Sequence, residues 1–134
     1  MELDEIWSFV GNKHNKQWLW LSLCRRTTQI VAFFIGDRDK KSCQELKNNI
    51  PDDYKDCKSF SDLWESYEQV FDKEKHKSVD KKTGETAHIE RFNNTIRQRL
   101  ARYVRKTLSF SKSQDLHYMV TKQFIVNYNR SVTT

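Results

Sequence analysis

The chain has 134 residues, of which 37% are hydrophobic and 13% aromatic. This fits one folded domain and is too apolar for a disordered chain. With 3 Gly and 1 Pro, it is neither collagen-like nor a linker, and no apolar run approaches the ~18 residues of a membrane helix. The first residues are acidic, which argues against a secretory signal peptide.

The net charge of +6 is concentrated in the second half of the chain. Residues 1–67 carry a net charge of −1 and residues 68–134 a net charge of +7. The segment 88–112 holds seven basic residues and one acidic residue, Glu90. Clustered positive charge favours a polyanionic partner such as nucleic acid; the alternative is a solvated helix face.

The cysteines indicate a reducing compartment. Their number is odd, and the spacing of Cys24, Cys43 and Cys57 fits neither a disulfide framework nor a zinc site. We therefore predict reduced thiols, used mostly for packing, in a cytoplasmic protein.

Three strands are predicted near the N-terminus, because residues 3–10, 17–25 and 29–36 are rich in aromatic and β-branched residues. Their close succession predicts an antiparallel meander. A helix over 43–50, capped by Ser42, and a weak strand over 56–61 follow.

Helices dominate the second half of the prediction. A short helix over 63–71 precedes a polar loop over 72–86. The helix over 87–106 is the clearest element, since Ile89, Phe92, Ile96, Leu100, Tyr103 and Val104 share one stripe. Ser111 or Ser113 caps a last helix near 112–128, with Leu116, Val120, Phe124 and Tyr128 facing inward.

Three acids occupy positions typical of an active site. Asp4 lies within an apolar strand, Asp62 ends the weak fourth strand, and Glu90 begins the basic helix. If the first and fourth strands are neighbours, these carboxylates converge, and converging carboxylates favour a divalent cation such as Mg²⁺. The alternatives are an edge-strand acid for Asp4, a helix cap for Asp62 and a helix-dipole charge for Glu90.

Three blocks of the sequence resemble transposases of the insertion sequence 1 family. Residues 88–113, HIERFNNTIRQRLARYVRKTLSFSKS, are similar to the family's C-terminal block, with its I-E-R-x-N core. The opening ELDEIWSFVG resembles its E-x-D-E-x-W strand, and SDLWESYE resembles its T-D-G-W-x-x-Y-E segment, with departures at Leu63 and Glu65.

The resemblance implies an α/β, RNase H-like fold with a DDE active site. Asp4, Asp62 and Glu90 would be the catalytic and metal-binding residues, with Mg²⁺ as cofactor and Mn²⁺ as its substitute. The match at Asp62 is the least exact, so the substitutes to consider are Glu5, Asp56 and Glu65.

The helix after Glu90 supplies the candidate DNA contacts. Asn93, Asn94 and Arg97 lie on or near the face of Glu90, where Arg97 suits a phosphate and the asparagines suit a nucleotide or Glu90 itself. His88 is a candidate proton shuttle, with a surface histidine as the alternative. Phosphate contacts along the backbone of DNA are predicted for Arg91, Arg99, Arg102, Arg105 and Lys106. The four tryptophans, Trp7, Trp18, Trp20 and Trp64, are expected in the core rather than as stacking platforms.

The resemblance also implies the organisation and partners. Residues 1–134 would form a single catalytic domain, without the zinc-finger and helix-turn-helix region that precedes it in full-length relatives. The partners would be DNA, as element ends and target, and further copies of the chain in a homodimer or larger assembly; no membrane partner is expected. The location would be the cytoplasm of a prokaryote, at the nucleoid. A non-catalytic DNA-binding remnant and another RNase H-like nuclease, such as a ribonuclease H or a junction resolvase, remain alternatives.

Overall fold

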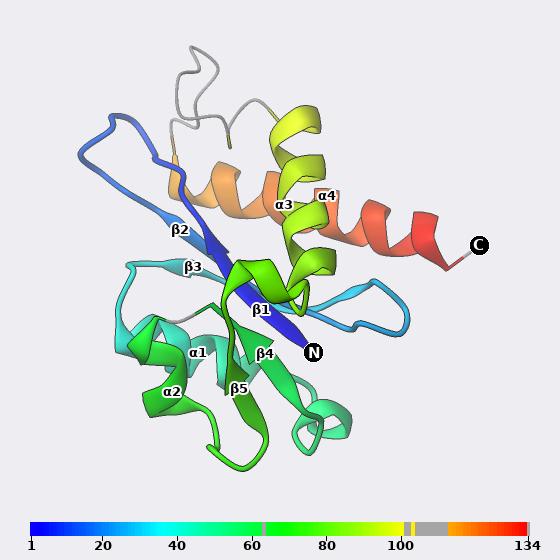
Figure 1. The fold of residues 1–134 in the computed structure, drawn as a ribbon. Coiled ribbons are helices and arrows are strands. Elements are labelled where there is room, and N and C mark those ends of the chain that lie inside the picture. Colours follow the sequence, from blue (N-terminus) through cyan, green and yellow to red (C-terminus); the bar gives the residue numbers. More distant parts are fainter. Residues whose placement is uncertain (63, 101–102, 104–112, 134) are drawn as a thin grey trace.

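The computed structural model is a mixed α/β domain with one sheet and helices on both of its faces (Figure 1). It describes residues 1–62, 64–100, 103 and 113–133. The strands are β1 (Glu2–Ile6), β2 (Trp18–Leu23), β3 (Ile30–Gly36), β4 (Ser59–Ser61) and β5 (His76–Ser78). The helices are α1 (Lys40–Asn49), α2 (Glu65–Val70), α3 (Ala87–Arg99) and α4 (Gln114–Val132), with short 3₁₀ turns at Asp52–Tyr54 and Lys81–Thr83.

The sheet has the strand order β3-β2-β1-β4-β5. β1, β2 and β3 form the predicted antiparallel meander, whereas β4 runs parallel to β1 and β5 parallel to β4. The predicted first strand is too long, since β1 ends at Ile6; beyond it the described chain makes one isolated bridge, between Phe9 and Lys16. The first and fourth strands are neighbours, which is the condition under which Asp4 and Asp62 were expected to converge.

β5 lies inside the segment predicted to be a loop. The sequence does not predict this strand because it has only three residues, HKS, and they are polar. Its pairing is supported by side chains: the His76 ring nitrogens lie 2.7 Å from Ser59 Oγ and 2.9 Å from Ser61 Oγ on β4. Burial lowers the pKa of His76 to about 4, so the ring is neutral at pH 7 and presents one donor and one acceptor to the two hydroxyls.

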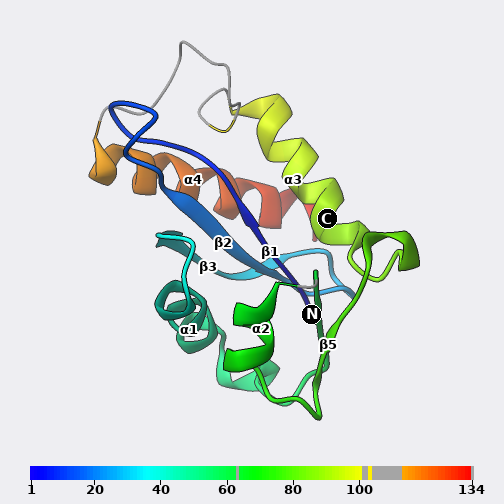
Figure 2. The ribbon, with the colours of Figure 1, turned by 60° about the vertical axis from the view of Figure 1, so that its left-hand side comes forward.

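Helices cover both faces of the sheet (Figure 2), and each face carries its own core. Alternate residues of a strand point to opposite faces, so Ile6 joins the core beneath α3 and α4 while Leu3 joins the core beneath α1 and α2. The first core contains Ile89, Phe92 and Ile96 of α3, as the predicted stripe requires. This packing fixes α3 against β1 and β2.

α1 begins earlier than predicted, and its cap is a different residue. The side chain of Asp39, not Ser42, caps the helix, with Asp39 Oδ1 accepting a hydrogen bond from Ser42 N at 2.8 Å. The three cysteines are free thiols, with Cys24 and Cys43 buried and Cys57 exposed.

The predicted helix over 87–106 ends at Arg99, because Leu100 leaves the helical conformation with φ −118° and ψ 107°. Tyr103 is buried nonetheless, and the fate of Val104 lies outside the described residues. Ser113 caps α4 as predicted, accepting from Leu116 N at 3.1 Å.

The inward face of α4 agrees with the prediction in part: Phe124 and Tyr128 pack against the core. Leu116 is 45% exposed, whereas the buried positions are His117, Thr121 and Ile125. Polar partners explain the burial of two residues that were not predicted to face inward: His117 Nε2 lies 3.0 Å from Ser8 Oγ, and Thr121 Oγ1 lies 2.6 Å from Tyr103 OH. Of the helices in the described part of the chain, none has the length and apolar character that crossing a membrane requires.

Candidate active site

Asp4 and Asp62 lie side by side because β1 and β4 are parallel neighbours. Glu2 of β1 is paired with Phe60 of β4. Asp4 is two residues beyond Glu2, and Asp62 is two residues beyond Phe60, directly after β4 ends. Parallel strands that advance together from one pair keep their later residues adjacent. The predicted convergence of these two carboxylates is therefore a consequence of strand register.

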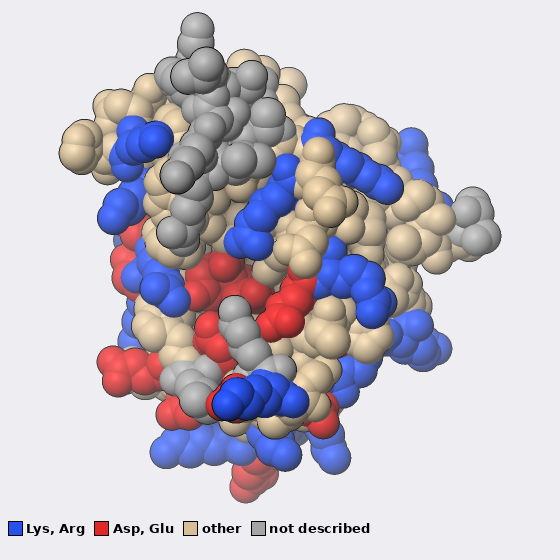
Figure 3. All heavy atoms as spheres, turned by 45° about the horizontal axis from the view of Figure 1, so that its top comes forward, with Lys and Arg blue, Asp and Glu red and all other residues tan. Residues whose placement is uncertain are grey.

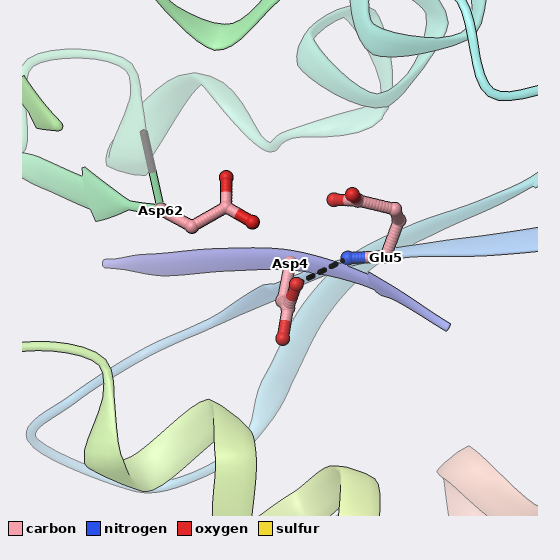
Figure 4. A group of neighbouring side chains, drawn as sticks. All are labelled: Asp4, Glu5 and Asp62. Atoms are coloured by element: carbon pink, nitrogen blue, oxygen red, sulfur yellow. Dashed lines mark hydrogen bonds between the residues drawn. The ribbon is translucent and has the colours of Figure 1, made fainter. Parts of the chain in front are cut away.

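Glu5 is the third carboxylate of this group. One oxygen each of Asp4, Glu5 and Asp62 lies within 4.8 Å of the others. Figure 4 shows Asp4 and Glu5 pointing to opposite sides of β1, with the Asp62 carboxylate turned toward them. Glu5 N donates to Asp4 Oδ1 at 2.8 Å, which fixes one oxygen of Asp4.

Glu5 is held from two sides. Its Oε1 accepts hydrogen bonds from Arg38 Nε at 3.1 Å and Nη2 at 2.9 Å, and its Oε2 accepts one from Tyr67 OH at 2.5 Å. Burial, followed by the negative charges of Asp4 and Asp62, raises the pKa of Glu5 to about 7, although Tyr67 and Arg38 oppose the rise. The group thus concentrates negative charge that a bound cation would neutralise.

Arg38 is the residue of this site that the sequence did not single out. Its guanidinium lies 4.9 Å from the Trp18 ring centroid and 4.7 Å from that of Trp64. The only signal in the sequence is its place between two aspartates, in the DRD segment directly after the third strand. Trp20 belongs to the core as predicted, and the half-buried Trp18 and Trp64 pack against that core while also contacting Arg38.

Glu90 faces the same cavity from α3. The cavity has a volume of about 410 Å³ and is lined by Asp4, Glu5, Trp18, Arg38, Asp62, Glu90, Asn93, Asn94 and Arg97. Glu90 is not part of the compact group of carboxylates that Asp4, Glu5 and Asp62 form. Its Oε1 accepts from Thr86 Oγ1 at 3.5 Å.

Asn93 contacts a carboxylate, and its exposure is low. It is 4% exposed, and its Nδ2 donates to Asp4 Oδ2 at 2.8 Å. Its Oδ1 is buried without a hydrogen-bond partner among the described residues. Asn93 therefore holds Asp4 from α3, one turn beyond Glu90.

Basic residues surround the acidic cavity. Arg97 and Asn94 line its wall, and Arg91 and Arg99 are exposed on the same helix. Figure 3 shows acidic side chains gathered in the middle of one face, with lysines and arginines around them. The predicted contacts Arg102, Arg105 and Lys106 lie outside the described residues.

The other sequence candidates lie elsewhere. Asp56 is exposed and pairs with Lys75 at 2.8 Å. Glu65 is exposed in the first turn of α2. His88 Nδ1 lies 2.8 Å from Glu2 Oε2, so its ring is directed to Glu2.

Comparison with known proteins agrees with the motifs. Residues 1–130 match the family model described as IS1 transposase. The chain is 39% identical to the insertion element iso-IS1n protein InsB of Shigella dysenteriae, over 92% of each chain. It is 35% identical to the insertion element IS1 4 protein InsB of Escherichia coli K12, over 92% of this chain and 72% of the relative.

A third relative is the insertion element IS1 protein InsB of Shigella flexneri, 34% identical over 92% of each chain. No solved structure matches the chain. The family model covers nearly the whole length, and the residues of all three motif blocks fall within it. This chain belongs to the IS1 transposase family.

Proposed function

We propose that this domain is the RNase H-like catalytic domain of a DNA transposase, which cuts DNA at element ends and joins it to a target. The observation that carries the proposal is the convergence of Asp4, Glu5 and Asp62 within 4.8 Å, in a cavity also lined by Glu90 and Arg97. The strand order, with a meander and two further parallel strands, supports the fold assignment.

The donor set suits a hard divalent cation. Carboxylate oxygens are the ligands that Mg²⁺ and Mn²⁺ prefer, and after burial the negative charges of Asp4 and Asp62 contribute to the raised pKa of Glu5. Asp4, Asp62 and Glu90 would hold such ions, with Glu5 as a further carboxylate beside Asp4 and Asp62. When bound, such ions supply Lewis-acid activation of the attacking hydroxyl and of the phosphate.

The two chemical steps are both phosphoryl transfers, in which the oxygen of water or of a hydroxyl attacks phosphorus and a 3′ oxygen leaves. In the first, water attacks the phosphorus, the bond from phosphorus to the 3′ oxygen breaks, and a 3′-hydroxyl and a 5′-phosphate remain. In the second, that 3′-hydroxyl attacks a target phosphodiester, and the target's own 3′ oxygen leaves. Arg97 of α3 and Arg38, between β3 and α1, both line the cavity and would orient the phosphate.

Metal binding tests the proposal directly. We expect a calorimetric titration of the full chain with MnCl₂ to show saturable binding, and Mn²⁺ to support nicking of supercoiled plasmid. The control is the same titration with Asp56→Asn, which should bind as the parent does. Absence of saturable binding in a folded protein would contradict the proposal and favour a non-catalytic DNA-binding protein.

Backbone contacts by α3 predict a change in salt dependence. Replacing exposed Arg91 and Arg99 with Gln should reduce the slope of log K against log salt for duplex DNA by up to about 1.8, since each lost phosphate contact removes about 0.9. The measurement is fluorescence anisotropy at several salt concentrations. A matched control replaces exposed Lys73 and Lys77, near β5; equal effects from both pairs would argue against α3 as the DNA contact.

A further inference from the structure

Glu2 is a fully buried carboxylate next to the proposed site. Its Oε1 accepts hydrogen bonds from two backbone amides of α3, His88 N at 2.9 Å and Ile89 N at 3.1 Å. Its Oε2 accepts from Arg25 Nε at 3.0 Å and lies 2.8 Å from His88 Nδ1. A side chain of β1 therefore binds the N-terminus of a helix more than 80 residues away.

Glu2 takes the place of a local cap. The first N–H groups of a helix lack partners within the helix, and the preceding side chain usually accepts from one of them. Here that residue is Thr86, with φ −115° and ψ 21°, and its side chain makes no such bond. The carboxylate of Glu2 both accepts from these amides and places a negative charge at the positive end of the helix.

Arg25 anchors Glu2 in turn. Besides Glu2, its guanidinium lies 4.3 Å from the Phe60 ring of β4, and it bonds the backbone oxygen of Glu85 just before α3. It also pairs with the Glu85 carboxylate at 3.3 Å. The buried charge of Glu2 is thereby paired, as a carboxylate away from water requires, and Glu2 is held between the sheet and α3.

Glu2 and Asp4 make two successive contacts between β1 and α3. Both residues lie on the same face of β1, and they are about 6.6 Å apart along the strand. Their partners on α3 are the His88 and Ile89 amides and the Asn93 side chain. These partners are separated by a rise of about 6.8 Å along the helix. The two contacts are therefore spaced equally along the strand and along the helix, and Glu90 lies between them in the sequence of α3.

We infer that Glu2 is a positioning residue that sets the register of α3 on β1, and through it the reach of Glu90 toward Asp4 and Asp62. The inference rests on the proposed function for its consequence in metal binding. The register of α3 on β1 does not depend on the proposed function, because it is set by contacts within the protein.

The test is Glu2→Gln in the full chain, because Gln keeps the shape and an acceptor oxygen but removes the charge that binds Arg25 and the helix terminus. We expect the His88 and Ile89 amides to exchange faster with solvent by NMR, and the Asn93 side-chain amide signal to shift as its bond to Asp4 weakens. We expect Mn²⁺ affinity to fall by about tenfold, the lower end of the range for residues that orient metal ligands, because Glu90 and Asn93 would move together with α3.

The matched control is Asp39→Asn, which weakens the corresponding cap on α1, a helix that carries no residue of the site. It should lower the thermal midpoint while leaving the Asn93 signal and Mn²⁺ affinity unchanged.

Two results would overturn the inference. One is faster exchange at His88 and Ile89 in Glu2→Gln with an unchanged Asn93 signal, which would make Glu2 a cap without influence on register. The other is an equal loss of Mn²⁺ affinity in Asp39→Asn, which would reflect general destabilisation. If the parent protein bound no Mn²⁺, the proposed function would fail, and the Asn93 signal would still decide the register.

Discussion

Replacing Asp4 with Asn should abolish Mn²⁺ binding at the site and reduce DNA nicking by at least about 10²–10³-fold, while duplex binding stays close to that of the parent. Asp4 is the central carboxylate: it is near Glu5 and Asp62 on one side and bonded to Asn93 of α3 on the other. Asn offers one neutral oxygen in place of two charged ones, which leaves too little charge to hold a divalent cation.

The fold should tolerate this replacement. Asn at position 4 can still accept from Glu5 N through its oxygen, as Asp4 Oδ1 does at 2.8 Å. Its new amide would meet the Asn93 amide, but Asn93 can turn over, because its Oδ1 has no partner among the described residues. The variant should therefore unfold at nearly the temperature of the parent.

Calorimetry with MnCl₂, plasmid nicking and anisotropy on duplex DNA measure the three expected properties. Asp56→Asn is the control, since Asp56 is an exposed acid paired only with Lys75 among its described contacts. Full nicking activity in Asp4→Asn would refute the assignment of the site. Loss of DNA binding together with nicking would point instead to a disrupted fold.

Replacing Phe92 with Ala should lower the free energy of unfolding by about 3–5 kcal/mol. Phe92 is 1% exposed, and its ring centroid lies 4.8 Å from that of Tyr128, edge to face, and 6.2 Å from that of Phe124. It packs in the core between the sheet and α4. The truncation removes a large apolar side chain and leaves a cavity that rigid neighbours fill only partly.

Such a loss is a large share of the 5–15 kcal/mol typical of a small domain. Urea unfolding followed by tryptophan fluorescence measures this loss of unfolding free energy. Metal affinity should also fall under conditions in which the variant is partly unfolded. Met119→Ala on α4 is the control, because Met119 is 64% exposed and its truncation should change stability by less than about 0.5 kcal/mol. A loss below about 1 kcal/mol for Phe92→Ala would mean that α3 does not depend on this core.

Local patterns were sufficient for the elements with strong periodicity. The apolar runs predicted β2 and β3 nearly to their ends, and the stripe of Ile89, Phe92 and Ile96 predicted which side of α3 is buried. These features follow from side-chain spacing along one segment, which is encoded by neighbouring residues. β5 was not predicted because three polar residues show no alternation of apolar and polar side chains.

The tertiary structure decided which third carboxylate lies close to Asp4 and Asp62. The motifs pointed to Asp4, Asp62 and Glu90, and the parallel pairing of β1 with β4 brings the first two together. The same geometry makes Glu5 their nearest partner in the described structure, although it leaves β1 on the opposite face. Adjacent residues of a strand point to opposite faces of the sheet. This alternation does not predict that the carboxylate of Glu5 lies close to those of Asp4 and Asp62.

Contacts between distant segments settled the remaining differences. Two buried residues of α4 are held by polar partners on other segments, Ser8 for His117 and Tyr103 for Thr121, and a pattern of apolar residues cannot predict such contacts. The cap of α3 comes from Glu2, more than 80 residues earlier. The sequence by itself therefore determined the family, the charge and the main elements, because these depend on residue types and local spacing. The grouping of the acids and the register of α3 depended on the tertiary structure, because each is made by side chains that only folding brings together.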